Sequence, residues 1–244
     1  MSFEVFNLKE VSAYLRVPED AIEDLARRGE MPCGRQGGRL SFRRDEVDAW
    51  ASRRLLGMPE KRLEDFHARW NAPGGGEESS GGRRIMGGLL ENGEGRVALG
   101  LTSRGKAGLI GDMVKLADGT GLVCDAGDLL VSLTEREKLC STAMAGGFAL
   151  LHPRNHEPYM FAESFLAVGR TVGRIYFGAE DGSATDVFFL ICCQDDRSHL
   201  HVLARLCMMC HHTAVLDEIR AAESPAEVVE RMVAAEAAVV GGGE

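Results

Sequence analysis

The sequence lacks any long apolar run. No stretch of its 244 residues approaches the roughly 20 consecutive apolar residues that a bilayer span needs. The first residues, Met1-Ser-Phe-Glu-Val, contain neither a basic segment nor an apolar one, as a secretion signal would. These absences predict a cytoplasmic protein with no membrane partner.

Positive charge is scarce in the larger part of the chain. The sequence has 28 Lys and Arg against 37 Asp and Glu, a formal net charge of −9. Residues 1–70 hold 13 of each sign, so the whole excess of negative charge falls on residues 71–244. That acidic part alone would repel nucleic acid.

Cysteine is present without a disulfide pattern. Seven cysteines, an odd number, in a chain with no secretion signal predict reduced thiols. Cys207-Met-Met-Cys210-His211 matches the Cys-x-x-Cys-His pattern of haem attachment, and with Cys192 and Cys193 it is also a candidate metal cluster. However, one stripe at helical spacing contains Leu200, Leu203, Cys207, Cys210 and Ala214. This stripe favours a core role for both cysteines, so we expect no haem, no metal and no other cofactor.

A glycine- and serine-rich segment divides the chain. Residues 71–82 read Asn-Ala-Pro-Gly-Gly-Gly-Glu-Glu-Ser-Ser-Gly-Gly, a composition typical of flexible linkers. With 45% hydrophobic residues, the chain can build a core on each side of it. We predict a small domain at residues 1–70, a linker at 71–84 and a larger domain at 85–240.

The small domain has the pattern of a helix-turn-helix. Asn7-Leu-Lys-Glu10 is a capping box that opens one helix, and Pro18 to Gly29 predict a second. A hairpin turn at Gly37-Gly38 and a third helix from Asp45 to Leu56 follow. Over about residues 5–56 this arrangement resembles the excisionase-like, winged branch of the MerR helix-turn-helix superfamily.

The charges of this domain favour two different partners. Arginines that could hold a DNA backbone line the predicted wing and its return strand: Arg35, Arg39, Arg43 and Arg44. Carboxylates that would face phosphates occupy the exposed face of the second helix: Glu19, Asp20, Glu23 and Asp24. We favour DNA as the partner; in the alternative, the arginines form ordinary surface ion pairs and the module docks to a protein.

Alternating helices and strands predict an α/β fold for the larger domain. Helical periodicity runs over Arg104–Ala117, Ala126–Glu137 and Ser224–Ala238, and Phe165–Val168 and Asp186–Cys192 have the composition of strands. Elements in this order predict an α/β sandwich, a mixed sheet flanked by helices.

Two histidine segments form the candidate site. In Phe148-Ala-Leu-Leu-His152 the histidine ends a short apolar strand, where an imidazole nitrogen can face a partner. In Asp195-Asp-Arg-Ser-His199, Ser198 is a good N-cap, which puts His199 in the first turn of a helix. The free N–H groups and the dipole there would stabilise a phosphoryl group on a neighbouring imidazole. The sequence alone does not show that the two histidines meet.

With the intervening segment Leu166–Gly182, these residues resemble the type-2 IIA proteins of the bacterial phosphotransferase system. The resemblance implies that His152 accepts the phosphoryl group and that His199 is the second histidine of the family's His-Leu-x-x-Leu segment. It also implies that Arg136, in Glu135-Arg-Glu-Lys-Leu-Cys-Ser-Thr142, lies beside the phosphohistidine. The implied partner is an HPr-like phosphocarrier, and the implied activity is that of a phosphotransferase component rather than a stand-alone catalyst.

Two residues depart from the family's pattern. Leu151 replaces the usual proline before the histidine, and Pro153 replaces the usual glycine after it. Pro153 removes one backbone N–H that could hold a phosphoryl oxygen.

Three functions fit these residues. The first is a transcriptional regulator of the nitrogen-regulatory IIA type, in which phosphorylation of His152 is coupled to DNA binding. The second is a phosphocarrier whose N-terminal module docks to a protein. The third is a degenerate IIA domain that binds partners without chemistry. A second copy of the chain is a further candidate partner.

Overall fold

The computed structural model describes residues 5–57, 84–91, 93–154 and 159–241. The chain divides into two compact units, Met1–Trp70 and Asn71–Glu244. The predicted linker at 71–84 lies, apart from its last residue, outside the described residues.

The first unit has a small antiparallel sheet and three helices. Its strands β1 (Val5–Phe6), β2 (Gly34–Gln36) and β3 (Arg39–Arg43) are ordered β1-β3-β2, and its helices are α1 (Leu8–Leu15), α2 (Glu19–Arg27) and α3 (Arg44–Leu56). The predicted capping box is confirmed, because Asn7 Oδ1 accepts the Glu10 N–H at 3.0 Å and Glu10 Oε2 accepts the Asn7 N–H at 2.7 Å. The predicted hairpin turn is also confirmed: Gly37 and Gly38 have φ of +58° and +79°, as a two-residue hairpin turn requires.

Two helix boundaries in this unit differ from the prediction, and one strand was not predicted. Pro18 is the N-cap of α2 rather than its first residue. The third helix begins at Arg44, so this arginine belongs to α3 and not to the return strand of the wing. The two-residue strand β1 was not predicted, because Val5-Phe6 is too short to show alternation.

The second unit is built on a five-stranded mixed sheet, as predicted. Its order is β4 (Val97–Leu101), β7 (Phe165–Ile175), β8 (Thr185–Cys192), β6 (Phe148–Leu151) and β5 (Ala143–Met144). Strand β4 runs parallel to β7 and β6 runs parallel to β8, whereas the β7–β8 and β5–β6 pairs are antiparallel.

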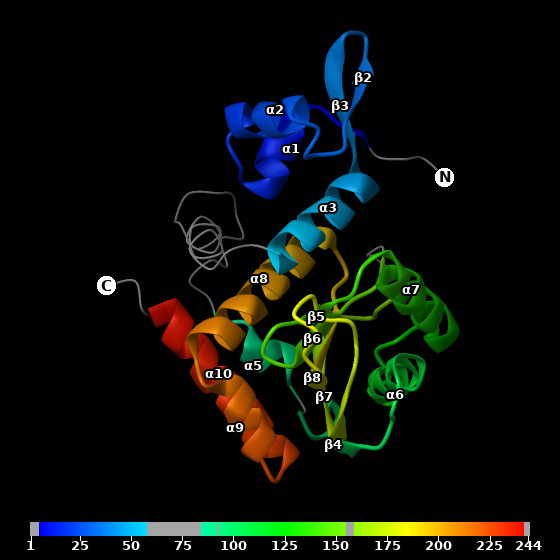
Figure 1. Cartoon of the computed structure of the whole chain (residues 1–244), viewed down its shortest axis with the longest axis vertical. Coiled ribbons are helices and arrows are strands. Elements are labelled where there is room, and N and C mark those ends of the chain that lie inside the picture. Colours follow the sequence, from blue (N-terminus) through cyan, green and yellow to red (C-terminus); the bar gives the residue numbers. More distant parts are fainter. Residues whose placement is uncertain (1–4, 58–83, 92, 155–158, 242–244) are drawn as a thin grey trace. The chain divides into compact units, whose positions relative to one another are not determined.

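Helices cover both faces of this sheet (Figure 1). On one face lie α6 (Lys106–Asp118) and α7 (Ala126–Leu139), which share a core cluster with alternate β8 residues Phe188, Leu190 and Cys192. On the other lie α8 (Asp196–His212), α9 (Val215–Ala221) and α10 (Pro225–Gly241), with the short α5 (Met86–Leu89) and a 3-10 turn at Gly93–Gly95 leading into β4. The predicted α/β sandwich is therefore confirmed.

A glycine lets α6 approach the sheet closely. A Cβ atom on Gly169 of β7 would lie 2.5 Å from Met113 Sδ of α6, closer than real Cβ contacts. Gly169 is thus needed for packing and not for a turn.

A fully buried ion pair fastens the last helix. Arg205 Nη1 of α8 lies 2.7 Å from Glu236 Oε1 of α10, and both side chains are completely buried. Glu236 also accepts the backbone N–H groups of Ile85 and Met86, at 2.8 and 2.9 Å. One carboxylate therefore ties the start of the unit to its final helix.

Several elements are longer than predicted or were not predicted. Strand β7 runs to Ile175 rather than Val168, and α10 covers Pro225–Gly241. Strand β4 and helix α9 were not predicted. No helix in the described part of the chain combines the length and apolar character of a membrane span.

Candidate functional site

The two predicted histidines meet because they follow neighbouring parallel strands. His152 comes directly after β6, and α8 begins four residues after the end of β8. Strands β6 and β8 pair up to Leu151 and Leu190, so their carboxyl ends lie at the same edge of the sheet. The ring centroids of His152 and His199 are 4.6 Å apart, with the ring planes inclined by 42°.

Both ring nitrogens of His152 have defined partners. Nδ1 lies 2.8 Å from the carbonyl oxygen of Leu150, which can only accept. Nε2 lies 2.9 Å from Nε of Arg136, which can only donate. These contacts fit a neutral imidazole with its proton on Nδ1, which leaves the lone pair of Nε2 directed at the guanidinium.

Arg136 is buried, with one donor group unused. Arg136 as a whole is 3% exposed. Its Nη1 donates to the carbonyl oxygen of Cys140 at 3.1 Å and to Cys140 Sγ at 3.4 Å. Nη2 is buried and has no hydrogen-bond partner among the described residues. In a planar guanidinium, Nε–H and the nearer N–H of Nη2 lie along one edge, the edge that grips oxyanions in bidentate fashion. The unused donor is therefore on the side of His152 Nε2.

The start of α8 differs from the prediction. Its N-cap is Asp195 and not Ser198: Asp195 Oδ1 accepts the Ser198 N–H at 2.8 Å, and Oδ2 accepts the Ser198 hydroxyl at 2.7 Å. A carboxylate complements the positive end of a helix dipole better than a hydroxyl does. His199 lies in the first turn as expected, but its own N–H already donates to the Asp195 carbonyl at 3.1 Å. The positive end of the α8 dipole is therefore already occupied by the carboxylate of Asp195.

Neither of the two residues directly after His152 offers a free backbone donor. Pro153 has no N–H, and the N–H of Arg154 donates to Ser132 Oγ of α7 at 3.0 Å. His156 lies outside the described residues. Among the described residues, Arg136 is well placed to hold a phosphoryl group on His152.

The site is closed in this structure. His152 is 2% exposed and His199 1%. A partner can therefore reach Nε2 only after side chains or loops around the ring have moved.

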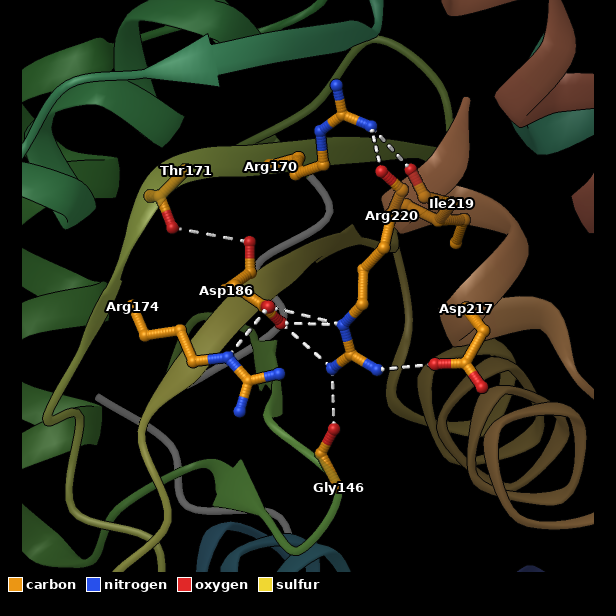
Figure 2. A network of polar contacts seen from close by, with 8 residues as sticks. All are labelled: Gly146, Arg170, Thr171, Arg174, Asp186, Asp217, Ile219 and Arg220. Carbon is orange, nitrogen blue, oxygen red and sulfur yellow. Dashed lines mark hydrogen bonds and ion pairs between the residues drawn. The ribbon is translucent and has the colours of Figure 1, made fainter. Parts of the chain in front are cut away.

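A second polar network lies at the other end of the same strands (Figure 2). Asp186, near the start of β8, accepts from Arg220 Nη2 of α9 at 2.8 Å and from Arg174 Nε at 3.2 Å. Arg220 Nη2 also donates to the Gly146 carbonyl at 2.6 Å. Arg170 Nη1 of β7 donates to the carbonyl groups that end α9. These contacts join residues of β7, β8 and α9, so this network holds α9 against the sheet.

The first unit contains a groove of about 870 Å³. It lies between the start of α1, helix α2 and the β2–β3 hairpin, and is lined by Asn7, Leu8, Lys9, Glu19, Glu23, Ala26, Arg27, Cys33, Gly34, Arg35, Gly38, Arg39 and Leu40. Charges of both signs therefore face one concave surface.

The structure separates the four predicted DNA-binding arginines. Arg35 and Arg39 line the groove. Arg43 lies outside it, 2.8 Å from Asp45, and Arg44 Nε lies 3.9 Å from Asp48. Ordinary ion pairs, the alternative considered for all four, thus account for the second pair.

The acidic face of α2 is also divided. Glu19 and Glu23 line the groove, whereas Asp20 and Asp24 do not. Asp24 pairs with Arg27 at 2.7 Å on the exposed surface. Only half of the predicted acidic face is thus directed at the groove.

The cysteines of α8 have the character of core residues. Cys207 is fully buried, and burial raises the pKa of its thiol to about 12. Although part of Cys210 reaches the surface, burial of its thiol raises its pKa well above the usual range, with Cys207 contributing. A cysteine binds a metal ion as a thiolate, which raised pKa values disfavour. Among the described residues, no group of three or more His, Cys, Asp or Glu is placed to hold a metal ion.

Comparison with known families identifies both units. The family described as "Phosphoenolpyruvate-dependent sugar phosphotransferase system, EIIA 2" matches residues 93–234. A helix-turn-helix domain family matches residues 5–55. No curated protein sequence matches the chain.

Solved structures of low sequence identity share the fold of the second unit. Nitrogen regulatory protein IIA-Ntr from Neisseria meningitidis is 22% identical, with a TM-score of 0.52 over 57% of this chain and 93% of that one. IIA mannitol from Escherichia coli is 19% identical, with a TM-score of 0.50 over 57% and 96%. In the complex of enzyme IIAMtl with phosphorylated enzyme IIBMtl from Escherichia coli, the matched chain is 18% identical, with a TM-score of 0.52 over 58% and 96%.

Proposed function

The chain belongs to the EIIA 2 family of the phosphoenolpyruvate-dependent sugar phosphotransferase system and carries a helix-turn-helix domain, and from that premise we propose that His152 accepts a phosphoryl group from an HPr-like carrier. The carrying observation is the unused, buried Nη2 donor of Arg136, on the guanidinium edge that already bonds His152 Nε2. A buried donor without a partner is costly, and a phosphoryl oxygen beside Nε2 would satisfy it.

The residues present support the following transfer step. Nε2 of neutral His152 attacks the phosphorus of the carrier's phosphohistidine, and the carrier's P–N bond breaks with its electron pair returning to the carrier's imidazole. Arg136 Nε–H moves from Nε2 to a phosphoryl oxygen, and Nη2 holds a second. The proton stays on Nδ1 and continues to be donated to the Leu150 carbonyl. The ring then carries a positive charge, which keeps the phosphoryl group labile.

We further propose that phosphorylation regulates DNA binding by the first unit. The helix-turn-helix domain on the same chain supports a regulatory role rather than a role in sugar transport. We assign that regulatory role to the nitrogen-regulatory type. The groove between α2 and the hairpin is the proposed DNA contact, with Arg35 and Arg39 on phosphates. An acidic domain on the same chain, made more acidic by a phosphoryl group, would weaken that contact.

The burial of His152 and the missing N–H of Pro153 favour a second candidate function. This candidate is a degenerate IIA domain that binds partners without accepting phosphate. Incubation with a phosphorylated HPr-like carrier, followed by intact mass measurement, distinguishes the two. Phosphoryl acceptance should add one acid-labile phosphoryl group to the wild type. His152→Ala should abolish the addition, and His199→Ala should slow it. Absence of labelling from any such carrier would favour the degenerate domain, and unchanged labelling of His152→Ala would move the site elsewhere, with His156 tested first.

A further inference from the structure

We infer that Glu137 is a positioning residue for this reaction: its carboxylate fixes the turn after α7 and thereby holds His152 as the Nδ1–H tautomer with Arg136 on Nε2. The inference rests on the proposed role of His152. It concerns a residue that touches neither histidine.

The Glu137 carboxylate is buried and completely engaged. Its side chain is 3% exposed. Oε2 accepts the Thr142 hydroxyl at 2.7 Å and the Thr142 N–H at 3.1 Å. Oε1 accepts from Lys106 Nζ of α6 at 2.8 Å, an ammonium that compensates the buried negative charge. Glu137 therefore fixes Thr142, five residues further along the chain.

Thr142 passes this constraint to the imidazole. Its carbonyl accepts the Leu150 N–H at 3.1 Å, which aligns the segment before β5 with β6. The Leu150 carbonyl in turn accepts the proton of His152 Nδ1 at 2.8 Å. Every group in this series is buried, so water does not compete for the bonds.

The same turn fixes Arg136, which precedes Glu137 on the last turn of α7. Arg136 Nη1 is anchored on the Cys140 carbonyl, two residues before Thr142, and Nε bonds His152 Nε2. Two series of hydrogen bonds therefore connect α7 to His152. One runs through Arg136 to Nε2, and the other runs through Glu137, Thr142 and Leu150 to Nδ1. Neighbouring residues on one helical turn control opposite nitrogens of one imidazole.

This arrangement matters because the tautomer decides which nitrogen is the nucleophile. In a neutral histidine, the hydrogen bonds of the two ring nitrogens decide which of them carries the proton. If the Leu150 carbonyl or the Arg136 guanidinium shifts, the proton can move to Nε2, which then has no lone pair for phosphorus. Misplacement of a reacting group by about 1 Å can cost roughly a hundredfold in rate.

The test is Glu137→Ala, with the ring ¹⁵N chemical shifts of His152 read by NMR before any phosphorylation. We expect the wild type to show one tautomer, with the proton on Nδ1, and the variant to show a mixture. The rate of phosphoryl acceptance should fall about tenfold to a hundredfold in kcat, with little change in KM for the carrier. The matched control is Glu135→Ala on the same helix, which removes an exposed carboxylate paired with Lys138 at 2.7 Å.

Two further variants keep the inference testable if Glu137→Ala does not fold. Glu137→Gln keeps an acceptor for Thr142 and should preserve the tautomer, whereas Thr142→Val removes the hydroxyl bond and should shift it partly. A single wild-type tautomer with unchanged rates in Glu137→Ala, or in Thr142→Val if Glu137→Ala does not fold, would overturn the inference. Because the NMR measurement needs no phosphoryl donor, failure of His152 to accept phosphate would be seen separately.

Discussion

The backbone N–H of Arg154 is bonded to the hydroxyl of Ser132, 3.0 Å away, at the position where a donor for a phosphoryl group on His152 would be useful. Pro153 supplies no N–H, so neither of the two residues after the histidine offers a free backbone donor to a phosphoryl group. This relationship sets the first prediction.

Pro153→Gly should speed phosphoryl acceptance, because it restores one backbone donor beside His152. One such donor can be worth about a hundredfold or more in a fully formed oxyanion site, and we expect about tenfold here. The measurement is the rate of acid-labile mass gain with a phosphorylated HPr-like carrier. Pro32→Gly in the first unit is the control, and an equal rate for Pro153→Gly and wild type would contradict the prediction.

Arg35→Ala combined with Arg39→Ala should weaken DNA binding on all sequences. Each phosphate contact adds about 0.9 to the slope of log affinity against log salt, so losing two contacts should lower that slope by about 1.8. Titration of the full-length protein into duplex DNA at several salt concentrations measures it. Arg43→Ala plus Arg44→Ala is the control, because these arginines already have carboxylate partners. Equal losses in both double variants would argue against the groove as the DNA contact.

Glu19→Gln plus Glu23→Gln should strengthen nonspecific DNA binding, because both carboxylates face the groove. Removal of an exposed charge is expected to change binding by about 0.5–1 kcal/mol. Fluorescence anisotropy with a random duplex at low salt is a suitable measurement. Asp20→Asn makes the same change of charge next to Glu19 but outside the groove, and it should have a smaller effect than Glu19→Gln alone. Were no variant to bind DNA even at low salt, protein docking would be the better function for this unit.

Purified protein should contain neither haem nor zinc, and six of its seven thiols should fall into two classes. Raised pKa values keep the buried thiols protonated at pH 8, so iodoacetamide should not label Cys192, Cys193, Cys207 and Cys210 before unfolding. Cys33 and Cys124 are exposed and should react first. Mass spectrometry of timed samples measures the labelling. A Soret band or stoichiometric zinc by elemental analysis would contradict the prediction.

Local signals were enough for most of the fold. The Asn7 capping box and the Gly37-Gly38 turn depend on neighbouring residues, and both are found in the structure. The helical stripe is found from Leu200 to Cys207, but α8 ends at His212 and Ala214 is exposed. Strand β4 escaped because Val97-Ala-Leu-Gly-Leu101 has no alternation, and it becomes a strand only by pairing with β7.

Only part of the candidate site could be predicted from the sequence. His152, His199 and Arg136 could be named from the resemblance, but their distances follow from the parallel pairing of β6 with β8, which no local pattern encodes. The sequence pattern does not single out Glu137, because a glutamate beside Lys138 on an amphipathic helix is typical of a surface residue. Only the fold shows that it is buried against Thr142. The groove likewise needs the hairpin and α2 in place.

The carboxylate of Glu236 has a consequence for the order of synthesis. It accepts the N–H groups of Ile85 and Met86, which precede it by 151 and 150 residues. The helix-turn-helix unit precedes all of these residues, whereas the phosphotransferase unit cannot secure Ile85 and Met86 until Glu236 has been made. We therefore expect truncated products, such as those from a premature stop before residue 236, to carry a folded helix-turn-helix beside an unfinished IIA unit.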